Sequence, residues 1–389
     1  MSRNILPEPP EELKPISEEL CARIRDNLDN DGLMPFSTFM EMALYEPGLG
    51  YYSAGLHKLG PSGDFTTAPE LGSLFAACLA GQVSQTADEL GEYDILEIGA
   101  GTGRLAADLL QSLPAKQLPS RYLILERSAD LREVQRQQIA ATTGLVERVE
   151  WLDEPPGQDW RGVLLANEVL DALAVERFRQ GEKGVEQLCV QAGDTRLGWA
   201  TRPAPDALEQ AVGHIVSDTG RDFQTGYRSE INLHLAPWLQ SVTAAMQRGL
   251  ALFIDYGYPR KEYYLPERSD GTLMCHYRHQ AHDDVFFWPG LQDITAWVDF
   301  TALAEAADSC GLEVEGYTSQ ALFLLGCGLD GLLMNHADNS ADGGLALNAQ
   351  ARQLTLPGMM GEKFQVMGLG RGLEIPPRGF SLQDLRHRL

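Results

Sequence analysis

The apolar positions of this chain fall into short runs that alternate with amphipathic stretches. The runs are rich in Leu, Ile and Val, which is typical of strands that are buried on both faces. Between them, apolar residues recur at helical spacing, as at 105–110 and 129–141. A repeating strand–helix order predicts an α/β fold with a doubly wound, mostly parallel sheet. The predicted core strands are 93–98, 122–126, 149–153, 162–166 and 250–257.

The segments around these strands predict a second lobe. Helical periodicity appears at 16–28, 36–44 and 71–90, and Ser37 is the expected N-cap of the second of these helices. Alternating strands at 175–178, 186–190 and 197–200 indicate a small antiparallel insertion, whereas 258–299 shows little periodicity. Further helices are expected at 231–246, 300–310 and 320–334, and further strands at 312–317 and 364–369.

These elements suggest a division of the chain into a core, two insertions and two tails. We expect a flexible tail at 1–15, a helical region with a covering loop at 16–90, a Rossmann-like core from 91–174, 229–257 and 300–372, a substrate lobe from the insertions 175–228 and 258–299, and a second tail at 373–389.

A glycine-rich turn follows the first core strand. Residues 97–103 read E-I-G-A-G-T-G and lead directly into a helix. Arg104 occupies the third glycine position of the dinucleotide fingerprint, and no G-x-x-x-x-G-K-[ST] phosphate loop occurs in the chain. The order E-x-G-x-G-x-G resembles the first motif of S-adenosylmethionine (SAM)-dependent methyltransferases. Glycines let the backbone approach such a ligand, and Glu97 can attract its ammonium group. A nicotinamide site and a turn without a ligand are the alternatives.

Polar or acidic residues end the predicted core strands. Ligands of such sheets bind outside the carboxyl ends of the strands, so the repetition indicates one binding crevice. Glu126 ends the second strand, where an acid commonly binds ribose hydroxyls, and Asp153 ends the third, where an adenine amino group would lie. One such acid alone would carry little weight, because helix N-caps produce the same pattern. The groups are Glu97, Glu126, Asp153, Asn167 with Glu168, and Asp255.

Composition narrows the class of protein. The 389 residues exceed what one compact core usually serves, and 44% hydrophobic with 22% charged residues is typical of a globular chain. The formal net charge of −24 argues against binding to nucleic acids or anionic membranes and is compatible with a cationic substrate.

The cysteines and the first residues of the chain indicate a compartment. Six cysteines show neither C-x-x-C nor zinc-like spacing, which is typical of reduced thiols. The first residues are acidic and proline-rich, without the pattern of a signal or transit peptide. The apolar stretch at 321–334 contains Asp330 and is too short to cross a bilayer. We therefore expect a cytoplasmic protein without a membrane span.

A set of further motifs, taken together, resembles the MidA-type methyltransferases, the family of the mitochondrial complex I assembly factor that methylates arginine. The resemblance extends over about residues 34–372. It implies a SAM-dependent fold with an added lobe, protein arginine methylation, and a respiratory complex I-type subunit as substrate. The motifs are PFSTFM at 35–40, YEPGLGYY at 45–52, GDFTTAPE at 63–70, LANEVLDAL at 165–173, SEIN at 229–232, IDYGY at 254–258, HDD at 282–284, QDIT at 292–295 and VDF at 298–300.

The resemblance also extends the predicted cofactor site. The GDFT segment at 63–66 is similar to the family segment that closes over the cofactor. The predicted SAM-binding residues are Gly63, Asp64, Phe65, Thr66, Glu97, Gly99, Ala100, Gly101, Thr102, Gly103, Glu126, Arg127, Leu152, Asp153, Asn167 and Glu168.

The turn after the fourth core strand carries the main catalytic candidates. An arginine guanidinium stays protonated in proteins, so methyl transfer to it requires carboxylates that grip it and align one nitrogen. Glu168 and Asp171 are spaced i, i+3 and can face one direction on a helical turn, although one of them could instead only cap that turn. The sequence NEVL at 167–170 stands where enzymes that methylate amino groups of DNA or glutamine carry N-P-P-Y, which argues against nucleic-acid methylation.

Secondary catalytic candidates are Glu230, Asp255 and His282. His282 titrates near neutrality and could relay a proton, although a surface loop cluster is the favoured interpretation of the HDD motif. His276, His279 and His282 have ligand-like spacing, but no sulfur ligand or fixed helix supports a metal, so none is expected.

The leading functional hypothesis is a SAM-dependent protein arginine N-methyltransferase. A small-molecule methyltransferase and a non-catalytic assembly factor that binds SAM or only a protein are the alternatives. The expected partner is a protein that presents an arginine. The sequence leaves the oligomeric state open, with a homodimer as one option.

Overall fold

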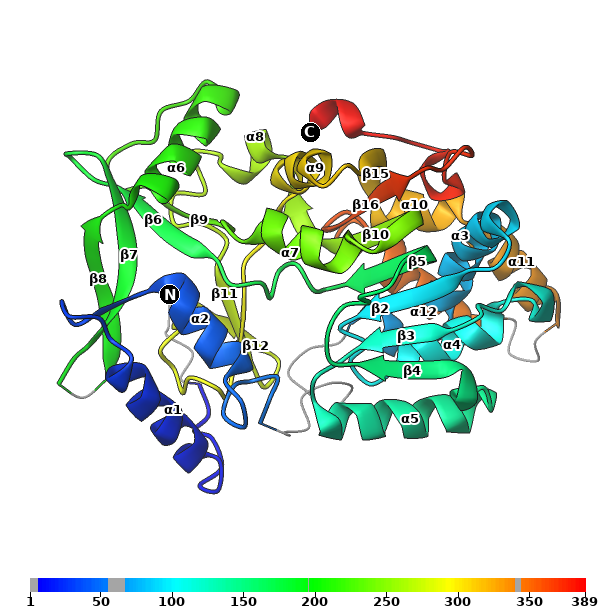
Figure 1. The fold of residues 1–389 in the computed structure, drawn as a ribbon, viewed down its shortest axis with the longest axis horizontal. Coiled ribbons are helices and arrows are strands. Elements are labelled where there is room, and N and C mark those ends of the chain that lie inside the picture. The colour runs from blue at the N-terminus through cyan, green and yellow to red at the C-terminus, as the bar shows by residue number, and fades with distance from the viewer. Residues whose placement is uncertain (1–5, 55–66, 195, 340–343) are drawn as a thin grey trace. The chain divides into compact units, whose positions relative to one another are not determined.

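The computed structural model describes residues 6–54, 67–194, 196–339 and 344–389, which form two compact units. The first, here called the sheet unit, comprises Thr66–Asp171, Leu235–Pro259 and Val298–Leu389. The second, here called the insertion unit, comprises Met1–Phe65, Ala172–His234 and Arg260–Trp297. Figure 1 shows the elements of both units as a ribbon.

An eight-stranded, mostly parallel sheet forms the centre of the sheet unit. Its order is β15-β16-β10-β5-β2-β3-β4, and β14 pairs with the end of β10. Strand β16 is antiparallel to both of its neighbours, and the other pairs are parallel. The predicted doubly wound sheet is confirmed. The strands are β2 (Asp94–Ile98), β3 (Tyr122–Leu125), β4 (Val149–Leu152), β5 (Trp160–Asn167), β10 (Met246–Tyr258), β14 (Val298–Asp299), β15 (Glu313–Ser319) and β16 (Phe364–Arg371).

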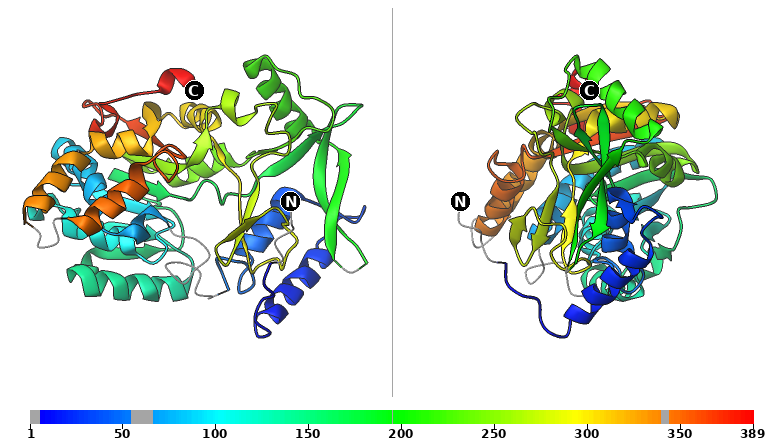
Figure 2. Two further views of the ribbon diagram at one scale, coloured as in Figure 1. Left: turned by 180° about the vertical axis from the view of Figure 1, so that it is seen from behind. Right: turned by 90° about the vertical axis from the view of Figure 1, so that its left-hand side faces the viewer.

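Helices cover both faces of this sheet, because successive residues of a buried strand point to opposite sides. One face packs Ile95, Val163 and Leu252 into a core with α3, α4 and α12. Phe253 points the other way and meets Trp238 of α7 at 6.2 Å between ring centroids. Helix α7 lies in front of the sheet in Figure 1, and the orange α12 comes forward in the reverse view (Figure 2, left). The helices are α3 (Leu74–Leu90), α4 (Arg104–Ser112), α5 (Ala129–Thr143), α7 (Leu235–Thr243), α9 (Phe300–Ser309), α10 (Gln320–Gly326), α11 (Leu329–Asn339) and α12 (Leu345–Thr355).

The insertion unit is built around an antiparallel sheet of order β1-β7-β6-β9, with β8 paired to β7. A smaller sheet has the order β12-β11-β13. Aromatic side chains of α2 fill the core: Phe36 lies 5.1 Å from Trp199, and Phe39 lies 5.5 Å from Phe286, between ring centroids. The elements are α1 (Lys14–Asp26), β1 (Leu33–Pro35), α2 (Phe36–Tyr45), β6 (Glu176–Gln180), β7 (Val185–Ala192), β8 (Leu197–Pro203), α6 (Asp206–Thr219), β9 (Arg228–Ile231), α8 (Arg260–Tyr263), β11 (Met274–Tyr277), β12 (Gln280–His282) and β13 (Asp293–Thr295).

The helix predicted over 231–246 is wrong at both ends. Ile231 closes β9, which pairs with β6, and Met246 opens β10. Between them, the Asn232 side chain accepts a hydrogen bond from the His234 backbone N–H at 2.9 Å, and this turn delays α7 to Leu235. The apolar spacing is shared by strand and helix positions here, so periodicity alone could not separate them.

Two further helix predictions need correction. The predicted helix over 320–334 is divided between α10 and α11, since Gly328 has a φ of +97° that a right-handed helix cannot continue through. Ser37 does not cap α2. Its hydroxyl instead donates a short hydrogen bond to the Glu176 carboxylate at 2.5 Å, and Pro35 precedes the helix.

The segment 258–299, in which little periodicity was expected, contains short strands and one helical turn. Strand β11 pairs with β12 and with β13, and Cys275 and Ile294 in this sheet are fully buried. Strands of three or four residues are too short to produce a visible alternation. Their existence depends on the tertiary pairing.

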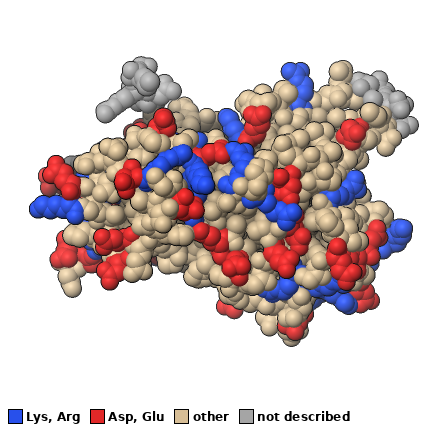
Figure 3. All heavy atoms as spheres, turned by 90° about the horizontal axis from the view of Figure 1, so that it is seen from above, with Lys and Arg blue, Asp and Glu red and all other residues tan. Residues whose placement is uncertain are grey.

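Charged side chains of both signs occur together at the surface. On the face drawn in Figure 3, Asp and Glu are interspersed with Lys and Arg, although the whole chain carries a net charge of −24. Among the described residues, no helix combines the length and the apolar character needed to cross a membrane.

Candidate functional site

The glycine turn lies at the carboxyl end of β2, as predicted. Gly99, Gly101 and Gly103 have φ angles of +68°, +53° and +82°, in the left-handed region that favours glycine. Helix α4 begins at Arg104, directly after the turn. The N–H groups at the start of this helix therefore face the carboxyl edge of the sheet.

Two of these glycines are also fixed by close packing. A Cβ atom on Gly99 would lie 2.9 Å from a methyl group of Val169, and one on Gly103 would lie 2.9 Å from the Cα atom of Gln135. The turn is thus in contact with the loop after β5 on one side and with α5 on the other. Any larger residue at these positions would separate the segments that form the crevice.

The covering segment is described only from its second half. Gly63, Asp64, Phe65 and Thr66, predicted to close over the cofactor, lie outside the described residues. The same motif continues into the helical turn η1 (Ala68–Leu71), where Glu70 accepts a hydrogen bond from the Thr102 hydroxyl at 2.5 Å. This contact attaches the described end of the motif to the glycine turn, in which Ala100 is also buried.

Glu97 is buried inside the sheet. Its side chain is 3% exposed and accepts a hydrogen bond from the Tyr122 hydroxyl on β3 at 2.6 Å. Burial raises the pKa of the Glu97 carboxyl to about 7, and the hydrogen bond from Tyr122 opposes that shift. A carboxyl group with this pKa can change its charge when a cation binds nearby.

Glu126 follows β3 at the same edge. One carboxylate oxygen accepts from the Ser128 backbone N–H at 2.8 Å, and the other accepts from the Gln135 side-chain amide at 3.3 Å. Burial raises the pKa of the Glu126 carboxyl above its ordinary value, against the hydrogen bonds that lower it. Ser128 also caps α5 by accepting from the Leu131 N–H at 3.3 Å. The carboxylate is therefore held in one orientation.

The residues after β4 are more exposed. The Leu152 carbonyl accepts from the Glu126 N–H at 3.1 Å, and this bond joins the two strand ends. The Asp153 carboxylate, 78% exposed, pairs with Arg132 at 2.6 Å, while Arg127 reaches the Asp153 carbonyl at 3.4 Å. The adenine contact assigned to Asp153 stays a prediction, and in this structure its carboxylate serves a surface ion pair.

The turn after β5 holds a non-glycine residue in the left-handed region. Glu168 has a φ of +54°, and its N–H donates to the Ile254 carbonyl at 2.9 Å. The Asn167 side-chain amide donates to the Glu168 carboxylate at 3.1 Å. The other side-chain atom of Asn167, Oδ1, is buried and meets no hydrogen-bond donor within the described part of the chain. An acceptor in this position suits a bound ligand with an N–H or O–H group.

Asp255 supports this turn from β10. Its Oδ2 accepts from the backbone N–H groups of Val169, Leu170 and Asp171 at 3.2, 2.9 and 3.2 Å, and its Oδ1 accepts from the Tyr256 N–H at 2.8 Å. The side chain is 1% exposed, and burial raises the pKa of its carboxyl above the ordinary value. The sequence makes Asp255 a secondary catalytic candidate, but its hydrogen bonds are those of a residue that fixes the loop backbone.

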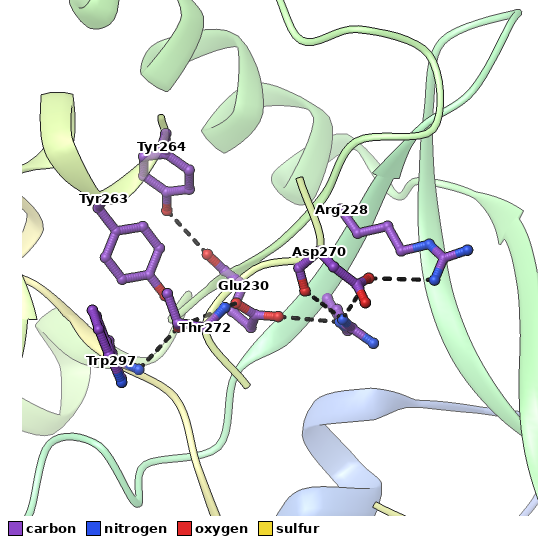
Figure 4. A network of polar contacts seen from close by, with 8 residues as sticks. Arg228, Glu230, Tyr263, Tyr264, Asp270, Thr272 and Trp297 are labelled. Carbon is purple, nitrogen blue, oxygen red and sulfur yellow. Dashed lines mark hydrogen bonds and ion pairs between the residues drawn. The ribbon is translucent and has the colours of Figure 1, made fainter. Parts of the chain in front are cut away.

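Two other catalytic candidates belong to the insertion unit. Figure 4 shows Glu230 on β9, where its carboxylate pairs with Arg177 at 3.1 Å. It also accepts from the Thr272 N–H at 2.8 Å and from the Thr272 hydroxyl at 3.3 Å. Arg177 in turn donates to the Asp270 carbonyl at 2.7 Å. Because Glu230 is 1% exposed and occupied on both oxygens, this arrangement is that of a buried structural ion pair.

His282 ends β12 in the insertion unit. Its Nδ1 accepts from the Asp284 N–H at 3.3 Å, and its ring meets Phe287 edge-on at 5.6 Å between centroids. Burial lowers the pKa of His282 below its ordinary value. No group of three metal-ligating side chains occurs among the residues for which coordinates are described.

The structure thus assembles most predicted cofactor residues at one edge of the sheet unit. The glycine turn, Glu126 and the Asn167–Glu168 pair follow neighbouring strands in the order β5-β2-β3. Gln135, a buried amide that contacts two of these segments, is not among the residues predicted from the sequence. The available signal was a polar residue on the core-facing side of α5, where Ile139 follows one turn later.

The chain is similar in sequence and structure to known members of a methyltransferase family. A family described as "Putative S-adenosyl-L-methionine-dependent methyltransferase" matches residues 76–318. A COG1565 superfamily protein from Burkholderia thailandensis, solved with S-adenosyl-homocysteine bound, is 40% identical and superposes with a TM-score of 0.93 over 99% of this chain and 100% of that one. A native crystal structure of a COG1565 protein from the same organism gives a TM-score of 0.90 at 40% identity, with the same coverage.

More distant similarity extends to curated enzymes. The mitochondrial protein arginine methyltransferase NDUFAF7 of Mus musculus is 27% identical in an alignment that covers 92% of this chain and 85% of that protein. The human protein of the same name is 26% identical in an alignment that covers 88% of this chain and 81% of that protein.

Proposed function

The chain belongs to the MidA-type family of SAM-dependent methyltransferases, and we propose that it methylates an arginine nitrogen of a protein partner. The family, the fold and the cofactor are established by the comparisons. The identity of the acceptor is the proposal. It rests on the turn after β5 and on the distant similarity to arginine methyltransferases.

The residues at the carboxyl edge of the sheet fit SAM. The left-handed glycines leave the backbone without side chains where a ligand must approach, and the buried Oδ1 of Asn167 is an acceptor that a ligand can satisfy. In this assignment Glu97 faces the ammonium end and Glu126 binds the ribose hydroxyls. When bound, SAM supplies a methyl group on a positively charged sulfur. The residues of the chain bind it, orient it and limit the access of water.

The acceptor must be brought to that methyl group by other residues. A guanidinium is permanently cationic and planar, so a carboxylate can both attract it and fix its plane through paired hydrogen bonds. Glu168 carries a carboxylate directly after β5, and Val169, the next residue, packs against Gly99 of the cofactor turn. The acid is therefore adjacent in the chain to a residue that touches the cofactor-binding backbone. Asp171 is 5% exposed and is the second acid of this loop.

The left-handed conformation of Glu168 is the observation that carries the proposal. A non-glycine residue with φ near +54° costs roughly 1–3 kcal/mol and persists where surrounding bonds enforce it. Here the Ile254 carbonyl and the Asp255 carboxylate hold the backbone on both sides of the residue. An energetically costly turn that aims an acid is typical of a residue that orients a substrate.

The test measures binding and methyl transfer separately. Purified protein is titrated with SAM by calorimetry and then incubated with radiolabelled SAM and a lysate from cells that lack this gene. We expect label in one protein band, in arginine after acid hydrolysis. In this proposal Glu168 contacts the acceptor and not SAM, so Glu168→Gln should retain SAM binding within a few-fold and lose about 100-fold or more in transfer rate. The exposed Glu133→Gln on α5 is the matched control and should change neither quantity.

Any other distribution of the label would favour a different function. Label in lysine, or only in small molecules, would refute the arginine proposal and favour a small-molecule or different protein acceptor. SAM binding without transfer of label to any component would favour an assembly factor. The cytoplasmic location and the identity of the target protein stay predictions, and fractionation with an antibody to this chain tests the first of them.

A further inference from the structure

A buried glutamine lies behind the cofactor edge of the sheet unit. Gln135 is on α5 and is 0% exposed, whereas every other residue of this helix except Ile139 is at least partly exposed to solvent. The buried positions of this helix are Gln135 and Ile139, one turn apart. An amide in a position that an aliphatic residue could fill requires hydrogen-bond partners, since an unpaired buried amide costs free energy.

The amide of Gln135 joins three segments that the sequence separates. Its Oε1 accepts from the Trp151 indole N–H on β4 at 2.8 Å. Its Nε2 donates to the Gly101 carbonyl at 3.0 Å and to the Glu126 carboxylate at 3.3 Å. The glycine turn, the end of β3 and strand β4 are thereby connected through one side chain.

The orientation of this amide is determined by the chemistry of its partners. An indole N–H can only donate, so the atom that faces Trp151 must be the oxygen of the amide. The amide nitrogen must then face the Gly101 carbonyl and Glu126. A backbone carbonyl can only accept a hydrogen bond, and so can the Glu126 carboxylate in its ionised form. The Gln135 backbone also lies against Gly103, where a Cβ atom would meet the Gln135 Cα at 2.9 Å. Gln135 therefore presents a donor to Glu126 in a fixed place.

We propose that Gln135 is a positioning residue of the cofactor site, which orients Glu126 for the ribose hydroxyls and fixes the Gly101 carbonyl of the glycine turn. One oxygen of Glu126 is held by the Ser128 N–H and the other by Gln135, so the plane of the carboxylate is set before the ligand arrives. The inference concerns the cofactor alone. It holds whichever acceptor the enzyme methylates.

The first experiment compares ligands that differ only in the ribose. S-adenosylhomocysteine and its 2′-deoxy and 3′-deoxy forms are titrated into the wild type and Gln135→Met by calorimetry. Methionine preserves the volume of the side chain but cannot donate to Glu126. We expect Gln135→Met to lower the affinity for S-adenosylhomocysteine by about tenfold or more, because it loses a hydrogen bond to a charged group. For at least one of the two deoxy ligands, the affinity of Gln135→Met should be less than about threefold below that of the wild type, because the ligand lacks the hydroxyl that contacts Glu126.

An equal loss for all three ligands would overturn the proposal, because it would indicate a general structural defect. Gln137→Met on the exposed side of α5 is the matched control and should leave all three affinities unchanged. Glu126→Gln combined with Gln135→Met should weaken S-adenosylhomocysteine by less than the product of the two single effects. Multiplicative effects would show that the residues act independently and would also overturn the proposal.

Two further variants remain informative if Gln135→Met does not fold. Gln135→Glu keeps the acceptor for Trp151 but places a second carboxylate beside Glu126, so its affinity for S-adenosylhomocysteine, relative to that of the wild type at the same pH, should recover as the pH is lowered from 8 to 6. Trp151→Phe removes the donor that fixes the amide and should give a loss smaller than that of Gln135→Glu at pH 8. A Gln135→Glu variant with wild-type affinity at every pH from 8 to 6 would contradict the assignment.

Discussion

Glu97 gives the sharpest prediction for cofactor binding, because its carboxyl is buried and its pKa is raised to about 7. In the free protein at pH 7, about half of the molecules therefore carry a protonated Glu97. If the ammonium group of SAM binds beside this carboxyl, the ionised form is stabilised and the proton leaves. Binding should release about half a proton at pH 7 and about 0.9 of a proton at pH 6.

The same linkage fixes the pH dependence of affinity. The reference is the dissociation constant of SAM at high pH, where Glu97 is fully ionised. Relative to that value, the dissociation constant should be about twofold higher at pH 7 and about tenfold higher at pH 6. Calorimetry in buffers with different heats of ionisation measures the released protons directly. The wild type is compared with Glu97→Gln, which keeps an oxygen that can accept from Tyr122 but cannot ionise. At pH 6 the α-amino group of SAM is almost fully protonated in both experiments, so the difference at that pH isolates Glu97.

Equal proton release by the wild type and Glu97→Gln would refute the reasoning. A second readout uses stability without ligand. Because the pKa of Glu97 is raised from 4.5 to about 7 on folding, Glu97 stabilises the folded protein fully below pH 4.5. This contribution to the unfolding free energy is lost as the pH rises to about 7. A shift of this size corresponds to about 3 kcal/mol of unfolding free energy. Denaturant unfolding of Glu97→Gln should lack that decline, and an unchanged pH profile would contradict the assignment.

Two further predictions concern the buried acids that support the backbone. Asp255→Asn leaves either the three backbone N–H groups of the turn after β5 or that of Tyr256 without an acceptor, and should lower the unfolding free energy by about 1–3 kcal/mol while reducing kcat more than SAM affinity. Wild-type stability in urea would contradict this prediction. Glu230→Ala leaves Arg177 buried without its closest carboxylate and should cost about 3–5 kcal/mol in the same assay; a loss below about 1 kcal/mol would show that the pair is dispensable.

The sequence predicted the sheet well because its signals are local. The core strands are continuous apolar runs, and each is followed by a turn residue or a helix cap, as Ser128 is for α5. The failures occur where local signals conflict with long-range pairing. Residues 228–231 form β9 only because β6 lies beside them, and 274–295 form strands only through pairing with one another. Neither partner can be identified from a window of adjacent residues.

The structure brings the candidate residues to one edge of the sheet, but the sequence did not distinguish their roles. A carboxylate at the end of a strand looks the same in sequence whether it faces a ligand or the backbone. Asp255 and Glu168 both lie at the carboxyl edge of the sheet. Asp255 accepts hydrogen bonds from four backbone N–H groups. Glu168 accepts one from the adjacent Asn167 side chain, and backbone hydrogen bonds around it hold its own position. Only the hydrogen-bond partners distinguish the supporting acid from the one that is supported.

Hydrogen-bond partners and position together separate four of the candidate acids. Glu230 and Asp255 have both carboxylate oxygens engaged by groups of the folded chain that are themselves buried or part of the backbone, so their removal should act first on stability. Glu97 and Glu126 are also bonded within the fold and have a pKa raised by burial, but they lie at the carboxyl ends of β2 and β3 beside the glycine turn, where a cationic or hydroxyl-bearing ligand can stabilise their charge. Stability and ligand affinity should therefore separate these two pairs in a single panel of Gln and Asn variants.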